Sequence, residues 1–216
     1  QTNQSAGHFQ QALDLDTLRF RADTQINERV RQVAERFNDT AFSFVDSEMA
    51  FKRASQPKPP GWNLLLEHVH YSFSGNYLLA TGFAGAILDT LDASIDGALL
   101  PAQEVARRIG YPNFTTIDAM GRLLDMVQTP PFTGQSNYAA LVDFINGTGA
   151  ALAQQVGSTQ DVIQRRQDLV AAGEADWQIH YELAELFRHE QDPKSALHHF
   201  RQVIQEYSHH GSSHLK

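Results

Sequence analysis

The chain has 216 residues and a mass of 24.1 kDa, and 42% of its residues are apolar, so it can bury a core. Its 17 Lys and Arg against 25 Asp and Glu give a net charge of −8, which argues against nucleic-acid and anionic-membrane partners. The absence of cysteine excludes disulfide scaffolds, thiol nucleophiles, thiolate zinc sites and iron–sulfur clusters. No apolar run approaches the ~20 residues of a membrane helix, so no membrane span is expected.

The first quarter of the chain predicts two helices around one strand. From Asp23 to Phe37, apolar residues recur at helical spacing, which indicates an amphipathic helix. The apolar, aromatic run Ala41–Val45 ends at Asp46 and predicts a strand. A short helix over 47–54 is expected next, with Asp46 and Ser47 as capping residues.

The rest of the sequence predicts helices that are separated by turns. Three prolines and a glycine make 56–62 a loop, and 67–73 is expected to be irregular. Ser74 is expected to cap a helix that runs to Leu91, and Pro101 to open one that ends near Gly110. Further helices are expected over 115–127 and 138–156, followed by two or three more.

A single strand cannot form a sheet, because its backbone donors and acceptors need a neighbouring strand. We therefore expect either that the strand at Ala41–Val45 pairs with another chain, including a second copy, or that the rest of its sheet lies outside this sequence. On this argument the chain is expected to be part of a longer protein.

The last helices carry small and aromatic residues at spacings that resemble the tetratricopeptide repeat, a helical hairpin of about 34 residues. The similarity covers about Asp176 to His209, with Asp192-Pro193 as the turn. The residues that carry it are Leu183, Ala184, Phe187, Ala196, Phe200 and Val203. His180 stands at a usual aromatic position and Ser208 at the usual closing proline. The run from Phe9 to Asp16 resembles the end of such a repeat.

The sequence Glu67-His68-Val69-His70 contains a carboxylate three residues before a histidine. On a tight turn, Glu67 and His70 can converge, so that the carboxylate fixes the imidazole tautomer and the other ring nitrogen takes a proton from a serine hydroxyl. Glu67 and His70 are therefore the candidate catalytic residues.

This stretch, followed by Ser72 to Ala80, resembles the last sequence block of SGNH (GDSL-type) hydrolases. In that family a carboxylate and a histidine lie in a loop before the final helix, with a glycine soon after. The resemblance implies that His70 is the general base, that Glu67 stands where the family usually has Asp, and that Gly75 is the glycine at the helix start. Other segments extend the resemblance to bacterial proteins in which such a domain lies among repeats: 18–23, 26–27, 107–111 and 130–133.

The resemblance implies a mostly α fold with a small α/β portion, the C-terminal part of a three-layer SGNH-like domain followed by tetratricopeptide-like hairpins. The expected divisions are 1–22, the tail of a preceding repeat; 23–95, the hydrolase-like part; 96–157, a helical connector; and 158–216, a repeat. The compartment stays open between bacterial cytoplasm and periplasm.

The implied activity is serine-dependent hydrolysis of a small ester or an acylated carbohydrate. The family's Gly-Asp-Ser nucleophile and its oxyanion donors are not located in this sequence, so we expect this chain by itself to be inactive. The second hypothesis is a non-catalytic module that binds a protein or peptide partner through its repeats, with a degenerate hydrolase-like part.

The histidines allow other roles as well. His68 and His70 alternate and could bind zinc with Glu67 nearby, although the third or fourth ligand that a zinc site needs cannot be located; no metal is expected. The histidines near the C-terminus form a loose cluster of mostly solvated side chains, and Arg107-Arg108 is expected to be a solvated helix face. No phosphate loop or dinucleotide fingerprint occurs, so no cofactor is expected.

Overall fold

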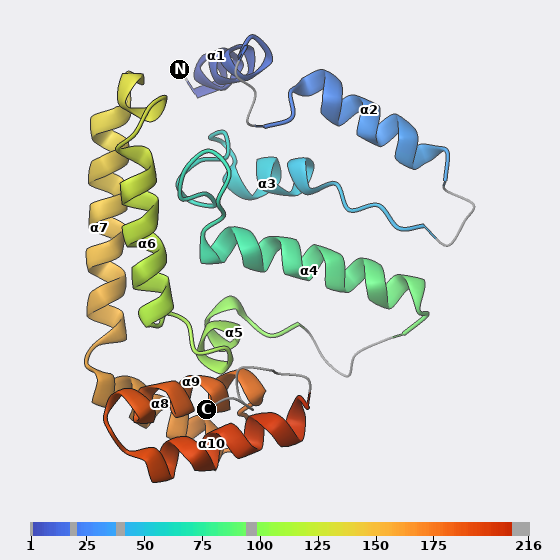
Figure 1. Cartoon of the computed structure of the whole chain (residues 1–216). Helices are drawn as coiled ribbons and strands as arrows, with labels where there is room; N and C mark the ends of the chain where they lie inside the picture. Colours follow the sequence, from blue (N-terminus) through green and yellow to red (C-terminus); the bar gives the residue numbers. More distant parts are fainter. Residues whose placement is uncertain (1, 18–20, 38–41, 94–98, 209–216) are drawn as a thin grey trace. The chain divides into compact units, whose positions relative to one another are not determined.

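The computed structural model describes residues 2–17, 21–37, 42–93 and 99–208, which divide into two compact units, Gln1–Leu100 and Pro101–Lys216 (Figure 1). In these ranges the chain forms ten α-helices and one 3₁₀ turn. The mostly helical fold is confirmed. The expected α/β portion is wrong: the only β-type pairing in the described ranges is an isolated bridge between Leu65 and Tyr71.

The expected strand at Ala41–Val45 is wrong for its described residues, 42–45, which form no strand; Ala41 lies outside the described part. A strand is defined by a partner, and no other segment of the described chain supplies one for Phe42–Val45. The apolar, alternating sequence therefore runs as a single extended segment into the next helix.

The first unit contains α1 (Thr2–Asp14), α2 (Thr24–Glu35), α3 (Ser47–Ser55) and α4 (Phe73–Thr90) (Figure 1). Asp23 caps α2 by accepting a 2.8 Å hydrogen bond from the Ile26 amide, and Asp46 caps α3 by accepting one of 3.0 Å from the Met49 amide. Asp46 is thus the capping residue that the sequence predicted. The cap of α4 is Ser72 instead of Ser74, because the helix begins two residues earlier than expected.

An ion-pair network joins α2 to α3. The Arg31 Nε donates to Asp46 at 2.7 Å, and the same guanidinium contacts Glu48. The hydrogen bond from Arg31 holds the pKa of Asp46 below its usual value, so this carboxylate stays charged while it caps α3. This network joins α2 to the start of α3.

The second unit begins with α5 (Ala102–Arg108), which Pro101 directly precedes. Gly110 follows the end of the helix with a φ of 71°, a conformation that suits glycine. The buried Arg166 guanidinium donates to the Gly110 carbonyl and pairs with Glu182 at 2.6 Å. The remaining helices are α6 (Phe114–Val127), α7 (Tyr138–Val156), α8 (Thr159–Ala171), α9 (Trp177–His189) and α10 (Pro193–Glu206).

Two helical hairpins build the core of the second unit. Helices α6 and α7 pack through Leu123, Val127 and Ile145, and α9 and α10 form the most extensive helix pair (Figure 1). Ala184 and Ala196 are buried between α9 and α10, and Phe200 packs with them. Small residues at that position let the two backbones approach closely.

The two units differ sharply in how much apolar surface they bury. Of the 20 buried apolar residues in the described part, only Ala34, Phe51, Leu64 and Leu65 belong to the first unit. The expected division at 95/96 lies outside the described residues, and the other expected divisions stay predictions. None of the described helices is both long and apolar enough to cross a bilayer.

Candidate functional site

The loop that carries Glu67 and His70 is a tight, hairpin-like turn before α4. The Leu66 amide donates to the His70 carbonyl at 2.8 Å, and the Ser72 amide donates to the Leu64 carbonyl at 2.9 Å. Leu64 and Leu65 are buried and anchor the loop in the first unit. The turn that the sequence expected to be irregular is therefore held by its own backbone hydrogen bonds.

Gly75 fits the loop to the start of α4. A Cβ on Gly75 would overlap the Leu64 carbonyl oxygen, so the close approach of loop and helix requires glycine there. The Ser72 hydroxyl accepts a 3.2 Å hydrogen bond from the Gly75 amide and caps the helix. The glycine that the resemblance singled out is thus the contact point between the site loop and α4.

Glu67 is the buried centre of the site. Its side chain is 1% exposed, and its carboxylate accepts backbone hydrogen bonds from Val69 at 3.1 Å and from His70 at 2.7 Å. One carboxylate oxygen also contacts Nδ1 of His70, and the other contacts Nδ1 of His68. A single carboxylate therefore orients two imidazoles.

These contacts define the state of the His70 ring. A carboxylate is an acceptor only, so the proton between the two groups belongs to Nδ1 of His70, and in the neutral ring Nε2 is then the nitrogen that carries the lone pair. The His70 side chain is 61% exposed, against 22% for His68. The geometry thus presents one imidazole nitrogen to solvent in the form that can accept a proton.

His68 plays a different part. Burial lowers the pKa of the His68 imidazole, and electrostatic interactions with Arg21 and His70 lower it further, whereas the charge of Glu67 raises it. His68 is therefore neutral at neutral pH and donates its Nδ1 proton to Glu67. The sequence did not indicate that His68 and His70 share one carboxylate.

The described residues do not assemble a complete triad. The nearest serine in sequence, Ser72, uses its hydroxyl for the α4 cap, and Ser47 lies against the Val45 carbonyl at 3.5 Å. The Asn76 amide nitrogen lies 3.5 Å from the Tyr71 carbonyl, as a residue of the helix start. The structure therefore brings together Glu67 and His70, and among the described residues no serine is hydrogen-bonded to the His70 ring.

A zinc site would require Glu67, His68 and His70 to surround one metal ion. Within the described ranges, no group of three or more His, Asp or Glu side chains is arranged to hold a metal ion. Both Nδ1 atoms of His68 and His70 already contact Glu67. The zinc alternative therefore has no support in this geometry.

A second histidine pair lies between α9 and α10. His180 and His199 are 7% and 6% exposed, and their Nδ1 atoms are 3.0 Å apart. The expectation that the C-terminal histidines are mostly solvated is wrong for His199; His209, His210 and His214 lie outside the described residues. His199 follows Ala196 by three residues on the buried face, a spacing that could have indicated its burial.

Arg107 and Arg108 lie on an exposed helix face, as expected, with side chains that are 48% and 42% exposed, and they also form ion pairs. Both contact Glu104 in their own helix, and the Arg107 guanidinium reaches Glu174 at 2.6 Å. They tie α5 to the turn after α8.

Comparison with known proteins finds no match: no family model, no curated protein and no solved structure is similar to this chain. The resemblances to SGNH hydrolases and tetratricopeptide repeats thus rest on the residues quoted above. The function is therefore inferred from the geometry of the site.

Proposed function

We propose that the Glu67–His70 pair is the general-base half of a serine-dependent ester hydrolase of the SGNH type. One observation carries the proposal: a buried carboxylate holds Nδ1 of an exposed histidine. This arrangement leaves Nε2 of His70 as a proton acceptor at the surface, which is the role of the base in a hydrolytic triad.

In this mechanism His70 takes the proton from a serine hydroxyl as the serine attacks the ester carbonyl. The resulting imidazolium is stabilised by Glu67, and His70 then returns the proton to the leaving alcohol. The serine and the oxyanion donors would come from sequence other than these 216 residues. The substrate would be a small ester or an acylated carbohydrate, and this chain alone would be inactive.

The test uses the protein isolated from its native source and a fluorophosphonate probe. We expect one serine adduct in that protein and none in the 216-residue chain alone. Because general-base catalysis contributes ~10²–10⁴-fold, His70→Gln in the native-length protein should slow labelling by at least about 100-fold. The matched control is His189→Gln, since His189 is 83% exposed and remote in sequence.

Equal labelling of the His70→Gln and His189→Gln proteins would refute the role of His70. The absence of any adduct in the native protein would refute the hydrolase proposal as a whole.

A second candidate function is protein or peptide binding by tetratricopeptide-like hairpins. The observation that favours it is the close packing of α9 and α10 over the buried residues Ala184 and Ala196, with Tyr181 and Phe200 in an edge-to-face contact at 6.1 Å. Chemical cross-linking of the native protein in its source cells tests this. We expect cross-links from Lys194, exposed at the start of α10, to another polypeptide, and cross-links confined to this chain would count against it.

A further inference from the structure

The two oxygens of the Glu67 carboxylate are held in the same way. Oε1 accepts a hydrogen bond from the His70 amide at 2.7 Å and contacts Nδ1 of the His70 ring. Oε2 accepts one from the Val69 amide at 3.1 Å and contacts Nδ1 of the His68 ring. Each oxygen thus has one backbone donor and one imidazole donor. The hydrolase proposal uses the imidazole on Oε1 and leaves the imidazole on Oε2 without a role.

The donor from His68 completes the shell of a buried carboxylate. An ionised carboxylate offers about four acceptor sites, and the two amides and two rings supply four donors. Without the His68 ring, one site on Oε2 would be left to water or to the ring of His70. Water beside Oε2 would weaken the attraction between Glu67 and His70, because it raises the local dielectric constant.

The charge state of His68 suits this part. Burial is the main cause that lowers the pKa of its imidazole; Arg21 and His70 lower it further, and Glu67 raises it. A neutral ring donates to Oε2 without cancelling the negative charge of the carboxylate. That charge remains available for the imidazolium that forms on His70 when it takes a proton.

We propose that His68 is a positioning residue of the site: its ring occupies Oε2 of Glu67, so that Oε1 is kept for Nδ1 of His70. The inference rests on the proposed function of the Glu67–His70 pair and adds a third residue to it. His68 acts through Glu67 and does not need to touch the substrate. Its effect is to hold His70 in the tautomer whose Nε2 accepts the proton.

Nitrogen NMR of the imidazole rings in the full chain tests the proposal, because the Nδ1–H and Nε2–H tautomers differ in the chemical shifts of both ring nitrogens. The spectra are recorded at about pH 8.5, above the ordinary titration range of imidazole. The His70→Gln chain identifies the signals of His70 among the ten histidines. We expect the Nδ1–H tautomer for His70 in the unaltered chain.

Two variants of His68 separate the donor from the shape of the side chain. Asparagine and leucine have nearly the same shape, and only asparagine has an N–H donor at the place of the imidazole Nδ1. His68→Leu should therefore move His70 partly to the Nε2–H tautomer, whereas His68→Asn should keep the Nδ1–H tautomer. A merely structural role of His68 predicts the same loss from both variants.

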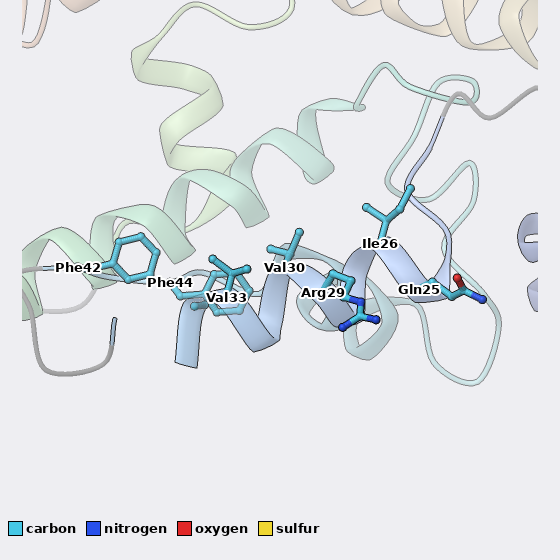
Figure 2. A pocket seen from close by; sticks show the side chains of 8 residues that line it. Gln25, Ile26, Arg29, Val30, Val33, Phe42 and Phe44 are labelled. Carbon is cyan, nitrogen blue, oxygen red and sulfur yellow. The ribbon is translucent and has the colours of Figure 1, made fainter. Parts of the chain in front are cut away.

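Hydrogen exchange of the Leu66 amide shows whether the turn is intact in each variant, because this amide donates to the His70 carbonyl at 2.8 Å. Should His68→Leu open the turn, His68→Phe repeats the test with a side chain that fills the space of the ring. The control in the same unit is Val30→Ala. It alters the apolar groove along α2 that Figure 2 shows, and no residue that lines this groove belongs to the site loop.

Fluorophosphonate labelling of the native-length protein gives a second readout. His68→Leu should slow labelling by roughly tenfold, as is typical when a residue that orients a functional group is lost, and His68→Asn should restore most of the rate. The tautomer is measured without any serine, so it decides the role of His68 even if the native protein forms no adduct and the hydrolase proposal fails.

Three results would overturn the role of His68. The first is a His70 ring that keeps the Nδ1–H tautomer in a donor-free variant with an intact turn. The second is a His70 ring that loses this tautomer in His68→Asn. The third is a turn that opens in both donor-free variants, which would make His68 a structural residue of the loop.

Discussion

Gly75 illustrates how a single residue fixes the candidate site. The Leu64 carbonyl occupies the space of a Cβ at Gly75, whereas Gly85, further along the same helix, has open space around it. Both glycines belong to α4, so they form a matched pair in which helix propensity is the same and packing differs.

Gly75→Ala is expected to destabilise the first unit by about 1–3 kcal/mol, because the new methyl group forces the loop away from α4. Gly85→Ala is expected to stabilise it by about 0.5–1 kcal/mol, since alanine is the better helix former. Chemical denaturation, followed by Trp62 fluorescence, measures the change in the free energy of unfolding for both substitutions. Equal effects of the two substitutions would show that the loop does not press on α4.

Glu67 is a second single residue that fixes the candidate site, in this case through its charge. Four donors converge on one buried carboxylate, two of them backbone amides of its own turn. The residue therefore shapes the turn and orients both histidines at once. Any substitution of Glu67 tests folding and chemistry together, and for this reason the functional test above uses His70.

At the scale of elements, the hairpin of α9 and α10 contains an internal pH dependence. Burial is the main cause that lowers the pKa of His199 to about 4, and the charges of His180 and His198 add to it. Burial also lowers the pKa of His180. Glu206 and Asp176 oppose this shift for His180, and Phe187 stacks on the His199 ring at 5.7 Å.

The hairpin should therefore lose stability in acid. Both histidines are neutral in the folded state, whereas the unfolded chain takes up protons below about pH 6.5. Stability is complete above that value and falls as the pH drops toward about 4, by up to about 3 kcal/mol for His199. Urea unfolding between pH 4 and pH 7, followed by Trp177 fluorescence, measures the slope.

His199→Leu should remove most of this slope, since it deletes the imidazole whose pKa burial lowers to about 4. His189→Gln serves as control, because His189 is 83% exposed and should leave the slope unchanged. A slope that survives His199→Leu would assign the acid sensitivity to other groups.

At the scale of the whole molecule, the two units differ in their capacity to fold alone. The helix pairs α6–α7, α8–α9 and α9–α10 all lie after Leu100, together with 16 of the 20 buried apolar residues. The second unit thus contains its own core.

A chain of residues 101–216 should unfold cooperatively, with a melting temperature within a few degrees of that of the corresponding transition in the full chain. A chain of residues 1–100 should aggregate or melt without cooperativity, because it exposes most of its apolar side chains. Thermal unfolding followed by circular dichroism at 222 nm compares the two. A cooperative 1–100 chain would contradict the small-core argument, and a non-cooperative 101–216 chain would contradict the division itself.

The sequence alone determined those features that depend on residues within one or two helical turns of each other. Helical spacing placed α2, α6 and α7 to within two residues at each end, and Asp46 was correctly identified as a cap. Glu67 and His70 could be paired because three-residue spacing on a turn brings them together. In each case the interacting groups are close in the chain, so the local pattern contains the answer.

Only the tertiary structure decided features whose partners are distant in sequence. Phe42–Val45 has the pattern of a strand, but a strand also needs a neighbour, which the described chain does not provide. Histidine is a polar residue type that is often found at the surface, but the packing of α10 on α9 buries His199 against His180. Arg107 is exposed, as expected, but its ion pair with Glu174, 67 residues away, was not indicated by the sequence. Long-range partners are set by packing of whole elements, and a local pattern carries no record of them.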